Sequence, residues 1–106
     1  MEEYRSDAEI RYDYQKAKEY ADKLCELANE IKQIANGTYE NTLNEISANW
    51  QGDSSNVFKN KAGKIKNDML KTANDIDRAA EKILATALSL YRAEMQAKEI
   101  AEKRGY

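Results

Sequence analysis

The chain has 106 residues, with 17 Lys and Arg against 19 Asp and Glu, a net charge of -2, one Cys, no Pro and no His. This length suits one small domain, and the composition excludes a disulfide framework within the chain and disfavours a structural zinc site or dedicated nucleic-acid binding. No apolar run approaches the ~20 residues that span a membrane, and residues 1–5 lack the apolar segment of a cleavable signal peptide.

The charges are divided unevenly along the chain. Residues 1–53 carry 6 Lys and Arg against 12 Asp and Glu, whereas residues 54–106 carry 11 against 7. An acidic half and a basic half favour antiparallel pairing. Exposed charge pairs contribute little each, so this bias supports the pairing without creating it.

A first helix is expected over residues 6–49. Ser6 and Glu9 have the spacing of a capping box, which marks a helix start. Apolar residues then recur at alternating spacings of four and three, which predicts one apolar stripe on a helix. The stripe comprises Ile10, Tyr14, Ala17, Ala21, Leu24, Ala28, Ile31 and Ala35, and it resumes with Tyr39, Leu43, Ile46 and Trp50.

Gly37 is the weak point of this helix, because Gly costs about 1 kcal/mol relative to Ala in a helix interior. Either the helix continues through Gly37, with or without a bend, or it breaks there and the protein has three helices. The apolar spacing stays helical across Gly37 and no Pro follows, so the continuous helix is favoured.

The segment 50–53 predicts a turn between two helices. Gly52 can adopt a positive φ without strain, and Asp53, Ser54 and Ser55 are all favourable N-caps. Trp50 is expected to bury a large area there and to cap the end of the core.

A second helix is expected over residues 54–101. Its apolar stripe comprises Phe58, Ala62, Ile65, Met69, Ala73, Ile76, Ala80, Ile83, Ala87 and Leu90. The sequence therefore predicts an all-α fold: one domain over residues 1–106, folded as an antiparallel two-helix hairpin.

A two-helix hairpin has no interior, so one flank of each stripe stays exposed. Such stripes usually mark association surfaces, and the simplest assembly is a dimer forming a four-helix bundle. The predicted hairpin and dimer interface comprises Leu24, Ala28, Ile31, Ala35, Leu43, Ile46, Phe58, Ile65, Met69, Ile76, Ile83 and Leu90.

The sequence contains no recognisable catalytic motif. The chain has no His base, no Gly-rich phosphate loop and no nucleophile elbow, and Asp75 and Asp77 fall on different helix faces. We therefore expect no enzyme activity, catalytic residue, metal, cofactor or small-molecule substrate. Cys25 is interpreted as a small half-buried hydrophobe, with an intermolecular disulfide as the alternative in an exported protein.

Four Tyr residues crowd the N-terminal third: Tyr4, Tyr12, Tyr14 and Tyr20. Tyr can cover apolar surface while its hydroxyl stays in water. These side chains either pack at the open end of the hairpin or form a patch that faces a partner.

Residues 49–54, Asn-Trp-Gln-Gly-Asp-Ser, resemble the central Trp-x-Gly turn of the WXG family, the hundred-residue, early secreted antigen-like substrates of type VII secretion. The resemblance extends to the chain length, the two helices and the aromatic Phe58 after the turn. It implies a hairpin that pairs as a homodimer or heterodimer into a four-helix bundle. It also implies export of the folded dimer by an ATPase-driven machine, from a cytoplasmic pool and without a cleavable signal peptide.

The chain departs from the family's export signal, Tyr-x-x-x-Asp/Glu after the second helix. No Tyr here has an acid four residues on: Tyr91 and Glu94 are one residue too close, while Leu90 and Glu94 have the right spacing. These three residues form a candidate degenerate signal. The departure raises an alternative in which a heterodimeric partner supplies the missing signal. The protein is then an accessory subunit that pairs with the helical N-terminal domain of a larger toxin and targets it for export.

A further alternative is an intracellular coiled-coil adaptor with no link to secretion. Any chain of this length with a four-three repeat could be one. A parallel coiled coil would need a continuous rod, which the segment 50–53 interrupts.

Overall fold

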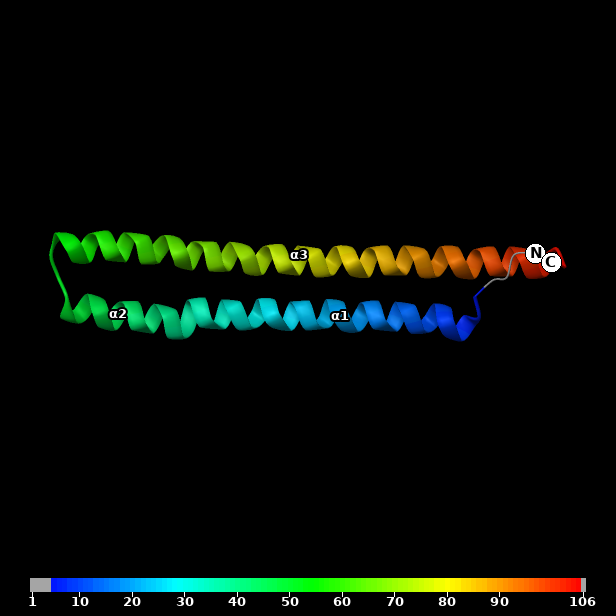
Figure 1. Ribbon diagram of the computed structural model, residues 1–106, viewed down its shortest axis with the longest axis horizontal. Coiled ribbons are helices and arrows are strands. Elements are labelled where there is room, and N and C mark those ends of the chain that lie inside the picture. Colours follow the sequence, from blue (N-terminus) through cyan, green and yellow to red (C-terminus); the bar gives the residue numbers. More distant parts are fainter. Residues whose placement is uncertain (1–4, 106) are drawn as a thin grey trace. The chain divides into compact units, whose positions relative to one another are not determined.

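The computed structural model describes residues 5–105 (Figure 1). In order they form α1 (Asp7–Gln33), the π-helical segment η1 (Ile34–Tyr39), α2 (Glu40–Asn49) and α3 (Asp53–Lys103). No strand occurs in this described part of the chain. The fold is therefore all-α, with two helical arms joined by a turn. None of the described helices is both long and apolar enough to cross a membrane.

The start of α1 shows the expected cap. The Ser6 hydroxyl oxygen accepts a hydrogen bond from the Glu9 N–H at 3.2 Å, which satisfies one of the donors left open at a helix start. The first arm ends at Asn49, and α3 begins at Asp53, one residue earlier than expected. It then runs two residues beyond position 101, to Lys103.

Gly37 lies within a π-helical turn, so the first arm is neither a uniform α-helix nor broken into two. Both Gln33 and Glu40, which flank the turn, have right-handed helical backbone angles. A π-turn takes up one more residue than an α-turn. The backbone therefore continues through Gly37 with one extra residue.

The apolar spacing explains why the extra residue is needed. The regular alternation of four-residue and three-residue steps fails around Gly37. Three successive steps of four residues occur there, from Ile31 to Ala35, Tyr39 and Leu43, whereas the alternation would place a three-residue step in the middle. A uniform α-helix would carry the later residues away from α3. With the π-turn, Tyr39 still reaches α3, and its hydroxyl donates to the Ala62 carbonyl at 2.8 Å.

We expect deletion of Gly37 to leave the fold intact, because it restores the regular alternation and converts the π-turn to α-helix. The free energy of unfolding should be unchanged or higher by up to about 1 kcal/mol, since a Gly leaves a helix. Deletion of the exposed Asn74 from regular α3 is the control. Deleting Asn74 rotates the side chains that follow it by about 100° about the helix axis. This deletion should lower the free energy of unfolding by more than about 2 kcal/mol. Thermal melts followed by circular dichroism compare the two, and equal losses would contradict this account of the π-turn.

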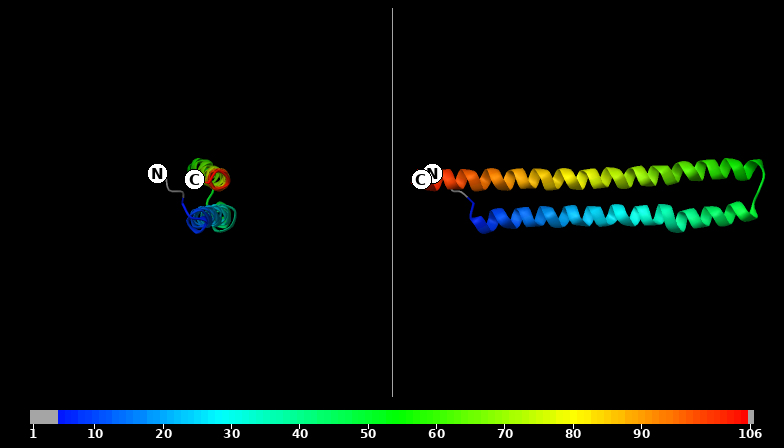
Figure 2. Two further views of the ribbon diagram at one scale, coloured as in Figure 1. Left: turned by 90° about the vertical axis from the view of Figure 1, so that its right-hand side faces the viewer. Right: turned by 180° about the vertical axis from the view of Figure 1, so that it is seen from behind.

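The chain divides into two compact units. One combines the described residues up to Lys23 with those from Ala79 onward, and the other is Leu24–Arg78. In each unit a segment of the first arm runs antiparallel beside a segment of α3 (Figure 2). The second unit contains η1, α2 and the turn.

The buried residues of both units are mostly Ala. They are Ile10, Ala21, Ala80 and Ala101 in the first unit, and Ala28, Ala35, Ser55, Ala62 and Ala73 in the second. Small side chains let two helices approach closely, because the interaxial distance depends on the side chains at the contact. The larger apolar side chains are consequently displaced to the edges.

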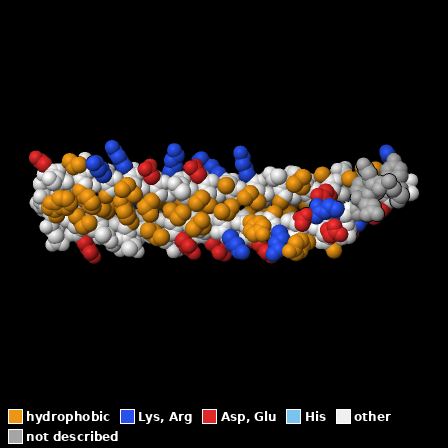
Figure 3. Space-filling view, in the orientation of Figure 1, with side chains coloured by type: hydrophobic (Ala, Val, Ile, Leu, Met, Phe, Trp, Pro, Cys, Tyr) orange, Lys and Arg blue, Asp and Glu red, His pale blue; other side chains and the backbone are white. Residues whose placement is uncertain are grey.

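The predicted interface residues therefore differ in burial. Ala28 and Ala35 are fully buried between the arms. Six are half-buried: Leu24, Ile31, Leu43, Ile46, Met69 and Ile76. Four are exposed in the single chain: Phe58, Ile65, Ile83 and Leu90. In the view of Figure 3, hydrophobic side chains form a belt along the line between the arms of the second unit.

Ion pairs also join the arms within each unit. Among the described residues these are Arg5–Glu94 at 3.1 Å, Asp7–Lys98 at 2.6 Å, Lys32–Asp77 at 2.7 Å and Glu40–Lys66 at 2.8 Å. In two of these pairs the acid lies in the first half of the chain and the base in the second, and in the other two the acid lies in the second half. The ion pairs between the arms therefore do not follow the net charge of the two halves.

Candidate functional site

The turn is built by Trp50 and Gly52. Trp50 leaves the helix with an extended backbone (φ -140°, ψ 120°), while its N–H still donates to the Ile46 carbonyl at 2.9 Å. Gly52 has a φ of +114°, a region that L side chains rarely adopt. The Gly52 carbonyl then accepts the Asn56 N–H at 3.0 Å, so Gly52 directly precedes the first turn of α3.

Ser55 closes this turn, a role that the sequence did not reveal. Its side chain is fully buried, and its hydroxyl donates to the Trp50 carbonyl at 2.7 Å. The sequence marked Ser55 only as one of three candidate N-caps. Its position three residues after Gly52 is the signal that could have identified it.

In the single chain Trp50 is only partly covered, so its expected role as a cap on the core of a four-helix bundle stays a prediction. The Trp50 side chain is 42% exposed and Phe58 is 39% exposed. The two rings pack on each other, with centroids 5.5 Å apart and planes tilted by 46°. A pair of helices offers no third neighbour that could cover the remaining ring surface.

Replacing Gly52 by Ala should destabilise the turn, because the φ of +114° strains any side chain. We expect a loss of about 1–3 kcal/mol in the free energy of unfolding. Gly63→Ala is the matched control: Gly63 lies within helical α3, and an added Cβ meets nothing within 4 Å. The Gly63→Ala change should raise the free energy of unfolding by up to about 1 kcal/mol, since Ala favours a helix over Gly. Urea unfolding measures both, and a Gly52→Ala variant as stable as Gly63→Ala would refute the role of the positive φ.

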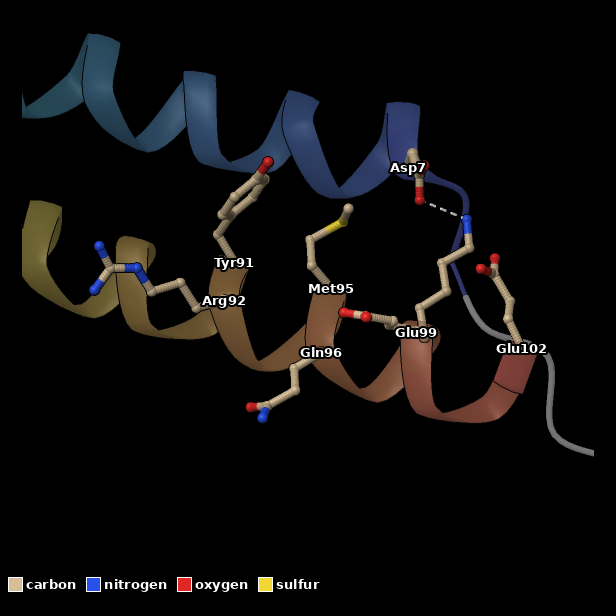
Figure 4. A pocket seen from close by; sticks show the side chains of 8 residues that line it. Asp7, Tyr91, Arg92, Met95, Gln96, Glu99 and Glu102 are labelled. Carbon is tan, nitrogen blue, oxygen red and sulfur yellow. Dashed lines mark hydrogen bonds and ion pairs between the residues drawn. The ribbon is translucent and has the colours of Figure 1, made fainter. Parts of the chain in front are cut away.

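The candidate export signal lies inside α3, and not after it. Tyr91 packs against Tyr14 of α1, with ring centroids 5.2 Å apart. In Figure 4, Tyr91 and Met95 point toward α1, whereas Arg92 and Gln96 point away. The aromatic member of the candidate signal is thus engaged by the other arm.

Glu94 is likewise engaged. Arg5 Nη1 donates to Glu94 Oε1 at 3.1 Å, while Nη2 donates to the Glu9 carbonyl at 3.1 Å and pairs with the Asp13 carboxylate. The hydrogen bond with Asp13, followed by the nearby negative charges, raises the pKa of Arg5 above its usual value. Leu90, one turn before Glu94, stays 58% exposed.

The three described Tyr residues of the N-terminal third differ in their surroundings. Tyr14 packs on α3, whereas Tyr12 and Tyr20 are 60% and 58% exposed. Lys16 lies 5.6 Å from the Tyr12 ring centroid, and Lys23 lies 6.0 Å from that of Tyr20. Such contacts contribute about 0.5–1 kcal/mol at exposed sites. Tyr4 lies outside the described residues.

Among the described residues, Asp7 and Lys98 form a short ion pair between the arms, with Lys98 Nζ donating to Asp7 Oδ1 at 2.6 Å. Both residues line an open groove whose lining also includes Met95, Glu99 and Glu102, and Figure 4 marks the hydrogen bond to Asp7 with a dashed line. The hydrogen bond from Lys98 lowers the pKa of Asp7 below its usual value of 3.8. This pair therefore stabilises the fold while Asp7 is ionised.

Lys98→Gln should lower the melting temperature at neutral pH, since it removes the partner of Asp7. Because the pKa of Asp7 is depressed in the folded state, the stabilisation is present above its usual pKa and is lost as the pH falls through the depressed value. The gap between wild type and Lys98→Gln should therefore narrow once the pH falls below the usual pKa of Asp, and it should close below the depressed value. Lys82→Gln, an exposed Lys of α3, controls for net charge. A gap that persists in acid would contradict the assignment.

Metal chemistry has no evident site in residues 5–105: no group of three potential Asp, Glu, Cys or His ligands comes together there. Cys25 is half-buried.

A comparison with family models matches residues 9–95 to WXG100, described as proteins of 100 residues with WXG. The matched region spans most of the chain and has the Trp50–Gly52 turn near its middle. The chain belongs to the WXG100 family. Neither a search of curated proteins nor one of solved structures found a match. As a WXG100 protein, it is a small helical protein of the type VII secretion substrate kind.

Proposed function

We propose that this WXG100 protein is a substrate or co-secreted partner of a type VII secretion system. It acts without catalysis, by pairing with another helical hairpin and presenting a helical surface to the ATPase of the secretion machine. It leaves a cytoplasmic pool without a cleavable signal peptide. One observation carries the proposal: Ala fills the contact between the arms, while larger apolar side chains lie exposed beside it.

In the second unit these side chains share one face. Ile31 and Lys32 lie about 100° apart on α1, on either side of the line of buried Ala, as do Ile76 and Asp77 on α3. Lys32 and Asp77 are paired at 2.7 Å, so their two flanks face the same side. Ile31 and Ile76 must then share the opposite side.

That apolar face continues along both arms. Leu27 and Ile34 extend it on the first arm, and Ile65 extends it on α3, with exposures of 45%, 51% and 53%. Burying one Leu or Ile side chain contributes about 1.5–3 kcal/mol. A helical partner that covers several of them gains enough to form a stable four-helix bundle, either as a second copy or as a different chain.

The partner is the point on which two versions of the proposal differ. A self-sufficient substrate forms a homodimer, whereas an accessory subunit pairs with another WXG-like protein or with the helical N-terminal domain of a toxin. Tyr91 packs on Tyr14 of α1, and Glu94 is paired with Arg5, which precedes α1. These contacts support the accessory version, in which the partner supplies the signal. A parallel coiled-coil adaptor fits poorly with the turn at Trp50 and Gly52.

Light scattering during size exclusion, with circular dichroism, tests the association. A highly helical dimer supports the self-sufficient substrate. A poorly folded or aggregating chain supports the accessory subunit and directs the search to co-purifying proteins. A stable, fully helical monomer would overturn the association argument.

Ile65→Ser should weaken association at least tenfold, since it places a hydroxyl on the apolar face, while the hairpin itself loses little because Ile65 is 53% exposed. Ile100→Ser is the matched control: Ile100 is 44% exposed but follows a different phase of the helical repeat. Sedimentation at several concentrations, with the partner present where one is needed, compares them. Equal weakening by both changes would exclude this face as the interface.

A further inference from the structure

The first unit contains a small cavity between α1 and α3. It is separate from the apolar face described above, which belongs to the second unit. Its volume is about 180 Å³. Most of its lining is apolar, from Ile10, Tyr14, Ala17, Ala87, Leu90 and Tyr91. The polar members, Arg5, Asp13 and Glu94, are those joined by the Arg5 ion pairs.

Arg5 occupies a position from which it can be displaced. It precedes α1, outside any helix, and its side chain is 40% exposed. Exposed ion pairs contribute little to stability, so releasing Arg5 from Glu94 costs little. Release would leave two carboxylates, Asp13 and Glu94, beside an apolar cavity.

We propose that this cavity receives one apolar side chain of the helical partner, next to a Lys or Arg of that partner which replaces Arg5 between Asp13 and Glu94. The inference rests on the proposed function, because it specifies what the partner must bring. Charge complementarity supports it: the two carboxylates are bridged by a cation of this chain, and a second cation can take the same place.

The size of the cavity fits a single side chain. An apolar cavity of about 150 Å³ is large enough to bind benzene. The cavity here is similar in volume but is partly open to solvent, and most of its lining is aliphatic or aromatic. It can therefore accept a Leu, Met or Phe side chain from outside. Leu90, 58% exposed, would be covered in the same step.

A benzene titration followed by methyl NMR of Ile10 and Leu90 tests the cavity itself. Both signals should shift in the wild type and should not shift in Ala17→Leu, which fills the cavity from α1. Ala93→Leu, at an exposed position of α3, is the matched control and should behave as the wild type. Ala87→Leu fills the cavity from the other arm if Ala17→Leu impairs folding. An unshifted wild type, or a filled variant that shifts as much, would overturn the proposal.

Export assays in cells with a type VII system test the role of the cavity. Arg5→Gln should raise export about two- to fivefold, since it removes a weak competitor of the partner's cation. Arg11→Gln makes the same charge change on α1 outside the cavity lining and should leave export unchanged. Ala17→Leu should reduce export. Equal export of Arg5→Gln and Arg11→Gln would overturn the inference alone, whereas absent export of the wild type would overturn the proposed function and the partner assignment.

Discussion

The structure depends on the close approach of helices whose contact is lined by Ala. In the second unit Ala28, Ala35 and Ala73 are fully buried, and no large apolar side chain is. Close packing gains dispersion contacts between the backbones, but it excludes Leu, Ile and Phe from the space between them. The exposure of these large side chains is therefore a consequence of how the arms pack. It leaves much of the apolar surface of a single chain in contact with water.

The same constraint accounts for the π-turn. Two helices in close contact must keep one narrow face toward each other along their length, so a slip of one residue in the apolar pattern has to be absorbed somewhere. The π-helical turn at Ile34–Tyr39 accommodates the extra residue, and it contains Gly37, which has no side chain. Tyr39 then hydrogen-bonds the Ala62 carbonyl. Backbone irregularity and side-chain pattern thus agree with each other.

Near Tyr91, in the first unit, an aromatic pair and ion pairs join the arms in addition to the buried Ala residues. A cavity lined in part by Arg5 lies beside them. Exposed ion pairs contribute little to stability. The proposal that a partner's cation replaces Arg5 rests on this low cost.

The sequence by itself determined the helical class, the cap at Ser6, the Trp50–Gly52 turn and the family, because these follow from local spacing and backbone preference. Only the tertiary structure decided that Gly37 lies in a π-turn, that Ser55 closes the turn, that Trp50 is half exposed, and that Arg5 links Asp13 to Glu94. These features depend on how closely the arms approach and on which residues come opposite one another. The apolar pattern along one helix marks the face that is buried, but it does not specify which residues of the other arm lie opposite that face.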